Sequence, residues 1–69
     1  MQKTIQIEGM MCPHCEKTVT KVLMNLPQVI EANVSYKEKQ AIITLDDDIC
    51  DDVLIKTIED EDFKVIAIQ

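Results

Sequence analysis

The spacing of apolar residues in this chain of 69 residues alternates between the period of a strand and that of a helix, which limits the folds it can form. Apolar residues occupy alternate positions in residues 3–8 and then recur three and four apart from Pro13 to Leu26. Pro27 is predicted to stop this helix. Strand spacing returns in residues 29–36 and 40–45, and the polar turn 37–39 between them predicts a hairpin.

Two further segments complete the predicted order. Leu54, Ile55 and Ile58 have helical spacing and follow the acidic stretch 46–52, whose charge favours a helix N-terminus. Residues 63–68 are predicted to form the closing strand. The order β-α-β-β-α-β predicts an α+β, ferredoxin-like sandwich with two helices on one face of a four-stranded antiparallel sheet. In that topology the loop after the first strand, the hairpin turn and the loop after the second helix share one end of the molecule.

Length and composition predict one domain over residues 1–69. A chain of this size buries only roughly 60% of its unfolded surface, so its stability is expected to be modest. Tyr36 and Phe63 are the only aromatic residues, so Ile, Val, Leu and Met must build the core. Bases would have no aromatic platform on which to stack.

The charge balance argues against a nucleic-acid partner. The chain has 13 acidic residues against 7 lysines, no arginine and a net charge of −6. The acids concentrate in residues 46–52 and 59–62, which suits either a solvated surface or docking to a basic partner. No apolar run approaches the ~20 residues of a membrane span, and residues 1–3 lead directly into the first strand, so a cytoplasmic location is expected and no membrane association.

The chemistry is concentrated in the segment from Gly9 to Cys15. Three cysteines are an odd number in a chain without an export signal, which favours reduced thiols with metal or redox chemistry over a disulfide framework. Cys12 and Cys15 flank the predicted start of a helix, where the dipole and free N–H groups favour thiolates. Soft thiolates select Cu(I) or Zn(II), and two sulfurs alone suit two-coordinate Cu(I) better than tetrahedral zinc. The pattern predicts one Cu(I) per monomer and no enzyme activity.

The heptapeptide Gly-Met-Met-Cys-Pro-His-Cys at residues 9–15, with this length and element order, resembles the heavy-metal-associated domain family and within it the small bacterial copper chaperones. The resemblance implies that Cys12 and Cys15 bind the metal, that Met10 packs beneath the loop and that Phe63 approaches it. It also implies transfer of copper by thiolate exchange to a P-type ATPase or a copper-responsive repressor. A metal-bridged homodimer through facing loops is an alternative assembly.

Each of four other side chains can be interpreted as having either a purely structural role or a functional one. Met10 is predicted to fill space in the core and Met11 to be an exposed loop residue. These roles are favoured over thioether ligation of copper. His14 is expected to point outward, where it could tune the Cys15 thiolate or form dimer contacts rather than bind metal. Cys50, which starts the second helix, is predicted to lie at the end of the fold opposite the metal.

Three positions depart from the family pattern, and one of them is Gln28, which replaces a common Gly after Pro27. Asp62 stands where the family usually has Gly, so the turn before Phe63 is expected to need an Asp in the left-handed conformation. Cys50 replaces the usual Ser or Thr at the helix N-cap, which predicts a weaker cap.

Two other functions fit parts of the motif. The same loop could carry zinc, cadmium or mercury as a binding module. Cys-Pro-His-Cys at a helix start also resembles strongly oxidising thioredoxin-like proteins. Those folds need a longer chain and normally an aromatic residue before the first Cys, whereas Met11 precedes Cys12 here.

Overall fold

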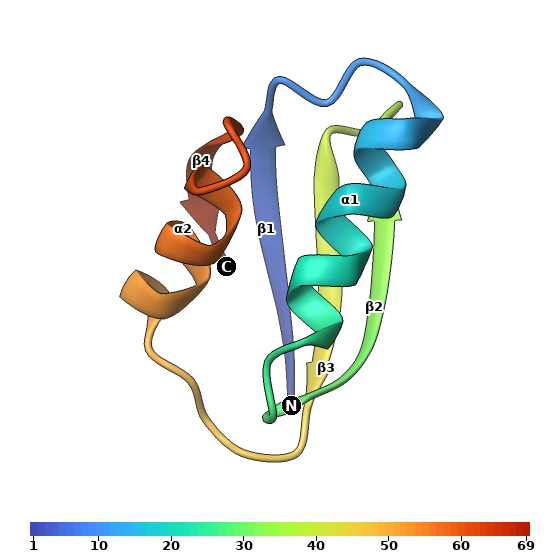
Figure 1. Ribbon diagram of the computed structural model, residues 1–69. Helices are drawn as coiled ribbons and strands as arrows, with labels where there is room; N and C mark the ends of the chain where they lie inside the picture. The colour runs from blue at the N-terminus through green and yellow to red at the C-terminus, as the bar shows by residue number, and fades with distance from the viewer.

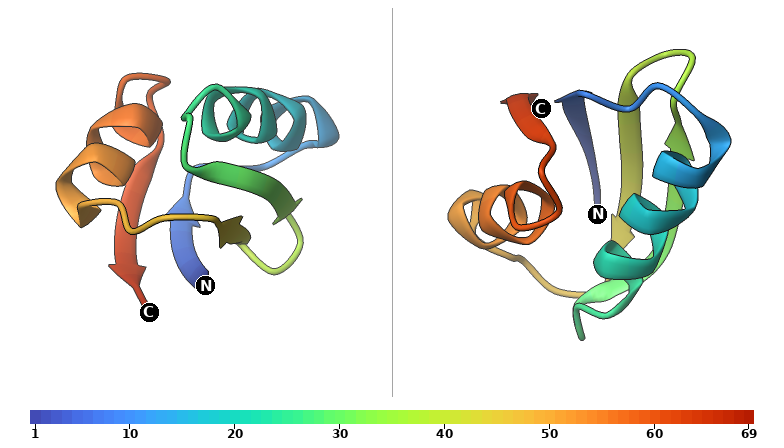
Figure 2. Two further views of the ribbon diagram at one scale, coloured as in Figure 1. Left: turned by 90° about the horizontal axis from the view of Figure 1, so that it is seen from below. Right: turned by 45° about the horizontal axis from the view of Figure 1, so that its top comes forward.

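The computed structural model describes residues 1–69 and confirms the predicted order of elements. The bounds are β1 Gln2–Glu8, α1 Pro13–Met24, β2 Val29–Ser35, β3 Gln40–Leu45, α2 Asp51–Glu59 and β4 Lys64–Ile68. The strands form one antiparallel sheet in the order β2-β3-β1-β4. Both helices lie on the same face of this sheet (Figures 1 and 2). Neither helix has the length and apolar character that crossing a bilayer requires.

Helix α1 begins as predicted and ends earlier than predicted. Pro13 occupies the first turn, where its missing N–H is not needed. The helix ends at Met24 with Asn25 as its C-cap, whereas the apolar spacing predicted continuation to Leu26. Leu26 precedes Pro27, and the proline ring disfavours helical backbone at that position.

The core lies between the helices and the sheet and contains only apolar side chains. Its 12 buried residues are Ile5, Ile7, Met10, Val19, Leu23, Val29, Ala41, Ile43, Leu45, Ile49, Leu54 and Ile58. Each large aliphatic side chain in this set stabilises the fold by about 1.5–3 kcal/mol relative to leaving it exposed. No polar side chain is buried, so the fold does not depend on an internal polar network.

The loops divide between the two ends of the sheet as the topology predicted. The β1–α1 loop, the β2–β3 hairpin and the α2–β4 loop share the upper end in Figure 1, while α2 begins toward the lower end. Cys50 is the N-cap of α2, is exposed and makes no side-chain capping hydrogen bond. The structure therefore confirms that Cys50 is a weak cap at the end opposite the β1–α1 loop.

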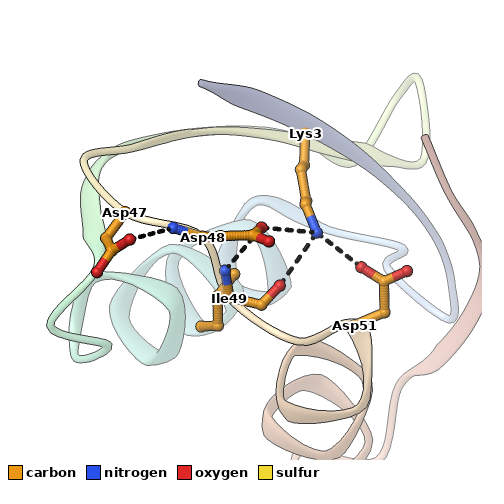
Figure 3. Close-up of polar contacts among 5 residues, drawn as sticks. All are labelled: Lys3, Asp47, Asp48, Ile49 and Asp51. Carbon is orange, nitrogen blue, oxygen red and sulfur yellow. Dashed lines mark hydrogen bonds and ion pairs between the residues drawn. The ribbon is translucent and has the colours of Figure 1, made fainter.

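Lys3 ties β1 to the uncapped start of α2 (Figure 3). Its Nζ donates hydrogen bonds to the Ile49 carbonyl at 3.1 Å and to Asp51 Oδ1 at 2.8 Å, and lies 3.8 Å from Asp48 Oδ1. The hydrogen bond to Asp51 raises the pKa of Lys3 above its usual 10.5, against a smaller opposing effect of burial. The ammonium thus joins two residues of the loop before α2 and the first residue of α2 to β1, a central strand of the sheet.

The turn into β4 contains the left-handed residue that the sequence predicted. Asp62 has a φ of 68°. For an L-residue this conformation costs roughly 1–2 kcal/mol, which Asp tolerates better than most. The turn therefore stores local strain immediately before Phe63.

We predict that Lys3→Met lowers the free energy of unfolding at pH 7 by about 1 kcal/mol, because a charged hydrogen bond is lost at a partly exposed site. The folded-state pKa of Lys3 is raised, so its contribution is complete below 10.5 and is lost as pH rises through the folded value. Urea denaturation at neutral and strongly alkaline pH measures both effects. Lys17→Met, an equal charge change at an exposed site on α1, should have little effect. Equal losses in both variants would contradict the role of Lys3.

We also predict that Asp62→Gly raises the free energy of unfolding by up to about 1 kcal/mol, because glycine adopts positive φ without steric cost. The matched control is Asp60→Gly, which removes the same charge from the same loop at a φ of −63°. There glycine should destabilise the fold by roughly 0.5–1 kcal/mol. Similar shifts in the urea midpoints of the two variants would show that charge, not backbone strain, controls stability at this turn.

Candidate metal centre

Gly9 turns the chain out of β1 and begins the loop. Its φ is +104°, a conformation that side-chain-bearing residues rarely adopt. A Cβ at this position would also lie 3.5 Å from Cδ1 of Phe63, so the ring of Phe63 packs directly beside the start of the loop. Phe63 itself is half-buried and packs against the core.

The two methionines of the loop lie in opposite environments. Met10 is 2% exposed and belongs to the core cluster, whereas Met11 is 86% exposed. The structure thus places Met10 beneath the loop as an apolar anchor. Met11 is a free thioether side chain at the surface next to Cys12.

The two sulfurs converge where the loop enters α1. Cys12 is the N-cap, with extended backbone (φ −156°, ψ 163°), and Cys15 lies in the first helical turn. The N–H groups of Cys15 and Glu16 both donate to the Cys12 carbonyl, at 3.1 and 3.3 Å. These bonds hold the Sγ atoms of Cys12 and Cys15 3.3 Å apart, and both cysteines are partly exposed.

The helix start also favours the ionised form of one thiol. The backbone N–H of Cys15 lowers the pKa of Cys12 below its ordinary value of 9.0, with further lowering from the Cys15 thiol and the backbone N–H of His14. Partial burial of the thiol opposes this shift. Two sulfurs, one of them an easily formed thiolate, are a ligand set for a soft metal ion.

The remaining candidates do not join the sulfur pair. The His14 side chain is exposed, and the residue acts on Cys12 through its backbone N–H. Cys50 lies at the start of α2, away from the loop. No three His, Cys, Asp or Glu side chains converge anywhere in the structure. The site therefore presents two sulfurs on an exposed loop.

This chain matches the heavy-metal-associated domain over residues 4–64. The chain belongs to the heavy-metal-associated domain family. Its topology, its Cys-x-x-Cys loop and its length agree with that membership.

Several named proteins and solved structures are similar to almost the whole chain. The copper chaperone CopZ of Staphylococcus aureus (strain JH9) is 30% identical over 66 residues, which cover 94% of this chain and 97% of that protein. A solved CopZ metallochaperone has a TM-score of 0.89 at 30% identity, covering 96% of this chain and all of its own. A copper-binding domain from HMA7, a P-type ATPase, has a TM-score of 0.85 at 27% identity, covering 100% and 99%.

One residue beside the cysteine pair has a contact that nothing in the sequence pattern indicates. Glu16 follows Cys15 in the first turn of α1, where an acidic residue is ordinary because it complements the helix dipole. In the structure its carboxylate instead accepts a hydrogen bond from the backbone N–H of Tyr36, just after β2.

We predict that Cys12 stays reactive toward iodoacetamide at a lower pH than an unstructured cysteine, because a lowered pKa leaves more thiolate. Site-resolved mass spectrometry of the metal-free protein across pH 5–10 measures this midpoint. Cys15→Ser should move the Cys12 midpoint upward, since it removes the thiol of Cys15. Cys50→Ser should leave it unchanged. An unperturbed Cys12 midpoint in the native chain would show that the helix start does not stabilise its thiolate.

Proposed function

We propose that this domain binds one Cu(I) ion between Cys12 and Cys15 and acts as a cytoplasmic copper chaperone. The observation that carries the proposal is a pair of partly exposed thiols, with Sγ atoms 3.3 Å apart at a helix start, without a third protein ligand. Membership of the heavy-metal-associated family and the similarity to CopZ chaperones support it. In this proposal the metal is cargo and the protein is a carrier rather than an enzyme.

The geometry of the sulfur pair suits reversible binding. Metal–thiolate bonds are about 2.3 Å long, so near-linear coordination needs sulfurs about 4.6 Å apart and the pair must open by about 1 Å. The N-cap position of Cys12, outside the helix, permits this movement. A two-coordinate ion also leaves room for an incoming sulfur, and both cysteines are partly exposed.

Transfer then follows as ligand exchange. A partner thiolate binds the ion as a third sulfur, and one of the two original metal–sulfur bonds breaks. A second partner thiolate displaces the remaining cysteine, and the released thiolates take up the protons that the partner thiols lost. The ion stays Cu(I) throughout, because no electron is transferred.

We propose a copper-transporting P-type ATPase as the receiving protein, or alternatively a copper-responsive repressor. Similarity to a copper-binding domain of one P-type ATPase supports the first, because two domains of the same fold can present matching loops to each other. A homodimer bridged by metal through facing loops is the corresponding assembly of two copies of this chain.

We predict that Cys12→Ser abolishes tight 1:1 Cu(I) binding, because one sulfur cannot complete a two-coordinate site. The measurement is anaerobic competition with a chromophoric Cu(I) chelator, with a parallel Zn(II) titration. Cys50→Ser is the matched control and should bind as the native chain does. Near-native affinity in Cys12→Ser would refute the assigned ligands, and tighter binding of Zn(II) than of Cu(I) would indicate a zinc carrier using the same loop.

A further inference from the structure

Glu16 links the metal loop to a distant part of the fold. Its Oε2 accepts a partly buried hydrogen bond from the Tyr36 N–H at 3.1 Å, across 20 residues of sequence. Glu16 lies next to Cys15 in the first turn of α1, and Tyr36 lies where β2 passes into the hairpin turn. A charged acceptor makes this bond stronger than a neutral one would. The first turn of α1 is therefore fastened to the hairpin.

The hairpin is a firm anchor for this contact. Tyr36 packs against the hydrophobic core. The Lys39 carbonyl at the other side of the turn accepts a hydrogen bond from the Ile7 N–H at 2.8 Å, which fixes the hairpin to the central strand β1. Through its hydrogen bond to Tyr36, the Glu16 carboxylate is therefore connected to the sheet.

The two cysteines differ in how firmly they are held. Cys15 lies inside the helix, packs against the core and directly precedes Glu16. Cys12 lies outside the helix and follows Met11, which is 86% exposed. Any widening of the sulfur pair is therefore easier on the Cys12 side.

We propose that Glu16 is a positioning residue for the metal thiolates. By holding the Tyr36 N–H it fixes the first turn of α1 and with it Cys15, so that the sulfur pair opens for the ion by movement of Cys12 alone. The role toward metal rests on the proposed function, whereas the restraint on Cys15 exists in the metal-free protein and is tested there.

The metal-free test compares Glu16→Ala, which removes the acceptor, with Glu16→Gln, which keeps an amide oxygen in its place. Amide exchange of Tyr36 by NMR reports the hydrogen bond, and site-resolved alkylation reports each thiol. We expect Glu16→Ala to lose Tyr36 protection and to alkylate Cys15 about threefold to tenfold faster, with Cys12 within about twofold of native. Glu16→Gln, which keeps a weaker neutral acceptor, should bring Tyr36 protection and Cys15 alkylation back close to their native values. Unchanged Cys15 alkylation in Glu16→Ala, with Tyr36 protection lost, would overturn the proposal.

A general loss of stability is separated by a control far from the loop. Val29→Ala removes buried side-chain volume at the start of β2, the strand end remote from Tyr36. It should lower the unfolding midpoint while leaving Cys15 alkylation and metal affinity as in the native chain. Faster Cys15 alkylation in Val29→Ala, matching that in Glu16→Ala, would assign the effect to stability and refute positioning.

The metal-bound test uses Cu(I) competition with the same variants. We expect Glu16→Ala to bind Cu(I) about threefold to tenfold more weakly, and Glu16→Gln and Val29→Ala to bind as the native chain does. If the native chain binds Cu(I) tightly and Glu16→Ala binds it with the same affinity, the metal-positioning role is refuted and the chaperone proposal stands. Failure of the native chain to bind Cu(I) would refute the chaperone proposal, while the alkylation result would still decide the restraint on Cys15.

Discussion

Burial of Met10 beneath the β1–α1 loop is the constraint on which the position of the cysteine pair depends. Met10 joins the core at 2% exposure, directly after Gly9 has turned the chain away from β1. The other side of the loop is held by α1, which buries Val19 and Leu23 against the sheet. Apolar packing holds the chain both before the cysteines, at Met10, and after them, in α1. The two cysteines can therefore stay at the surface while the loop keeps its conformation.

Electrostatic interactions have different effects at the two ends of the molecule, at the start of α1 and at the start of α2. At the loop end, N–H groups at the start of α1 lower the pKa of Cys12 and so favour its thiolate. At the other end, the weak cap at Cys50 is offset by Lys3, whose ammonium bonds the Ile49 carbonyl and Asp51. The start of α1 that carries the cysteine pair is therefore separate from the start of α2, which Lys3 holds to β1.

Much of the fold and of the candidate site could be predicted from local sequence patterns. The predictions that were wrong or incomplete have identifiable physical causes. The period of the apolar residues predicted every strand and helix. The presence of Asp62 where the family usually has Gly predicted a residue in the left-handed conformation. The end of α1 was wrong because apolar spacing continues to Leu26 although the following proline disfavours helical backbone. For His14, the sequence prediction considered only the imidazole, whereas the pKa of Cys12 is lowered mainly by the backbone N–H of Cys15 and to a smaller extent by that of His14. Every residue except proline has a backbone N–H, so the sequence predicted donors at the helix start as a group but not which of them would act on Cys12.

The order of the elements, the apolar face of each and the presence of two thiols at a helix start can all be inferred without coordinates, because they depend on spacings of a few residues. Which groups those elements bring together depends on how they pack in three dimensions. Lys3 meets Asp51 across 48 residues and Glu16 meets Tyr36 across 20. Neither pair has a spacing that marks it, since a hydrogen bond needs its partners within about 3 Å and that proximity is created by packing the helices on the sheet.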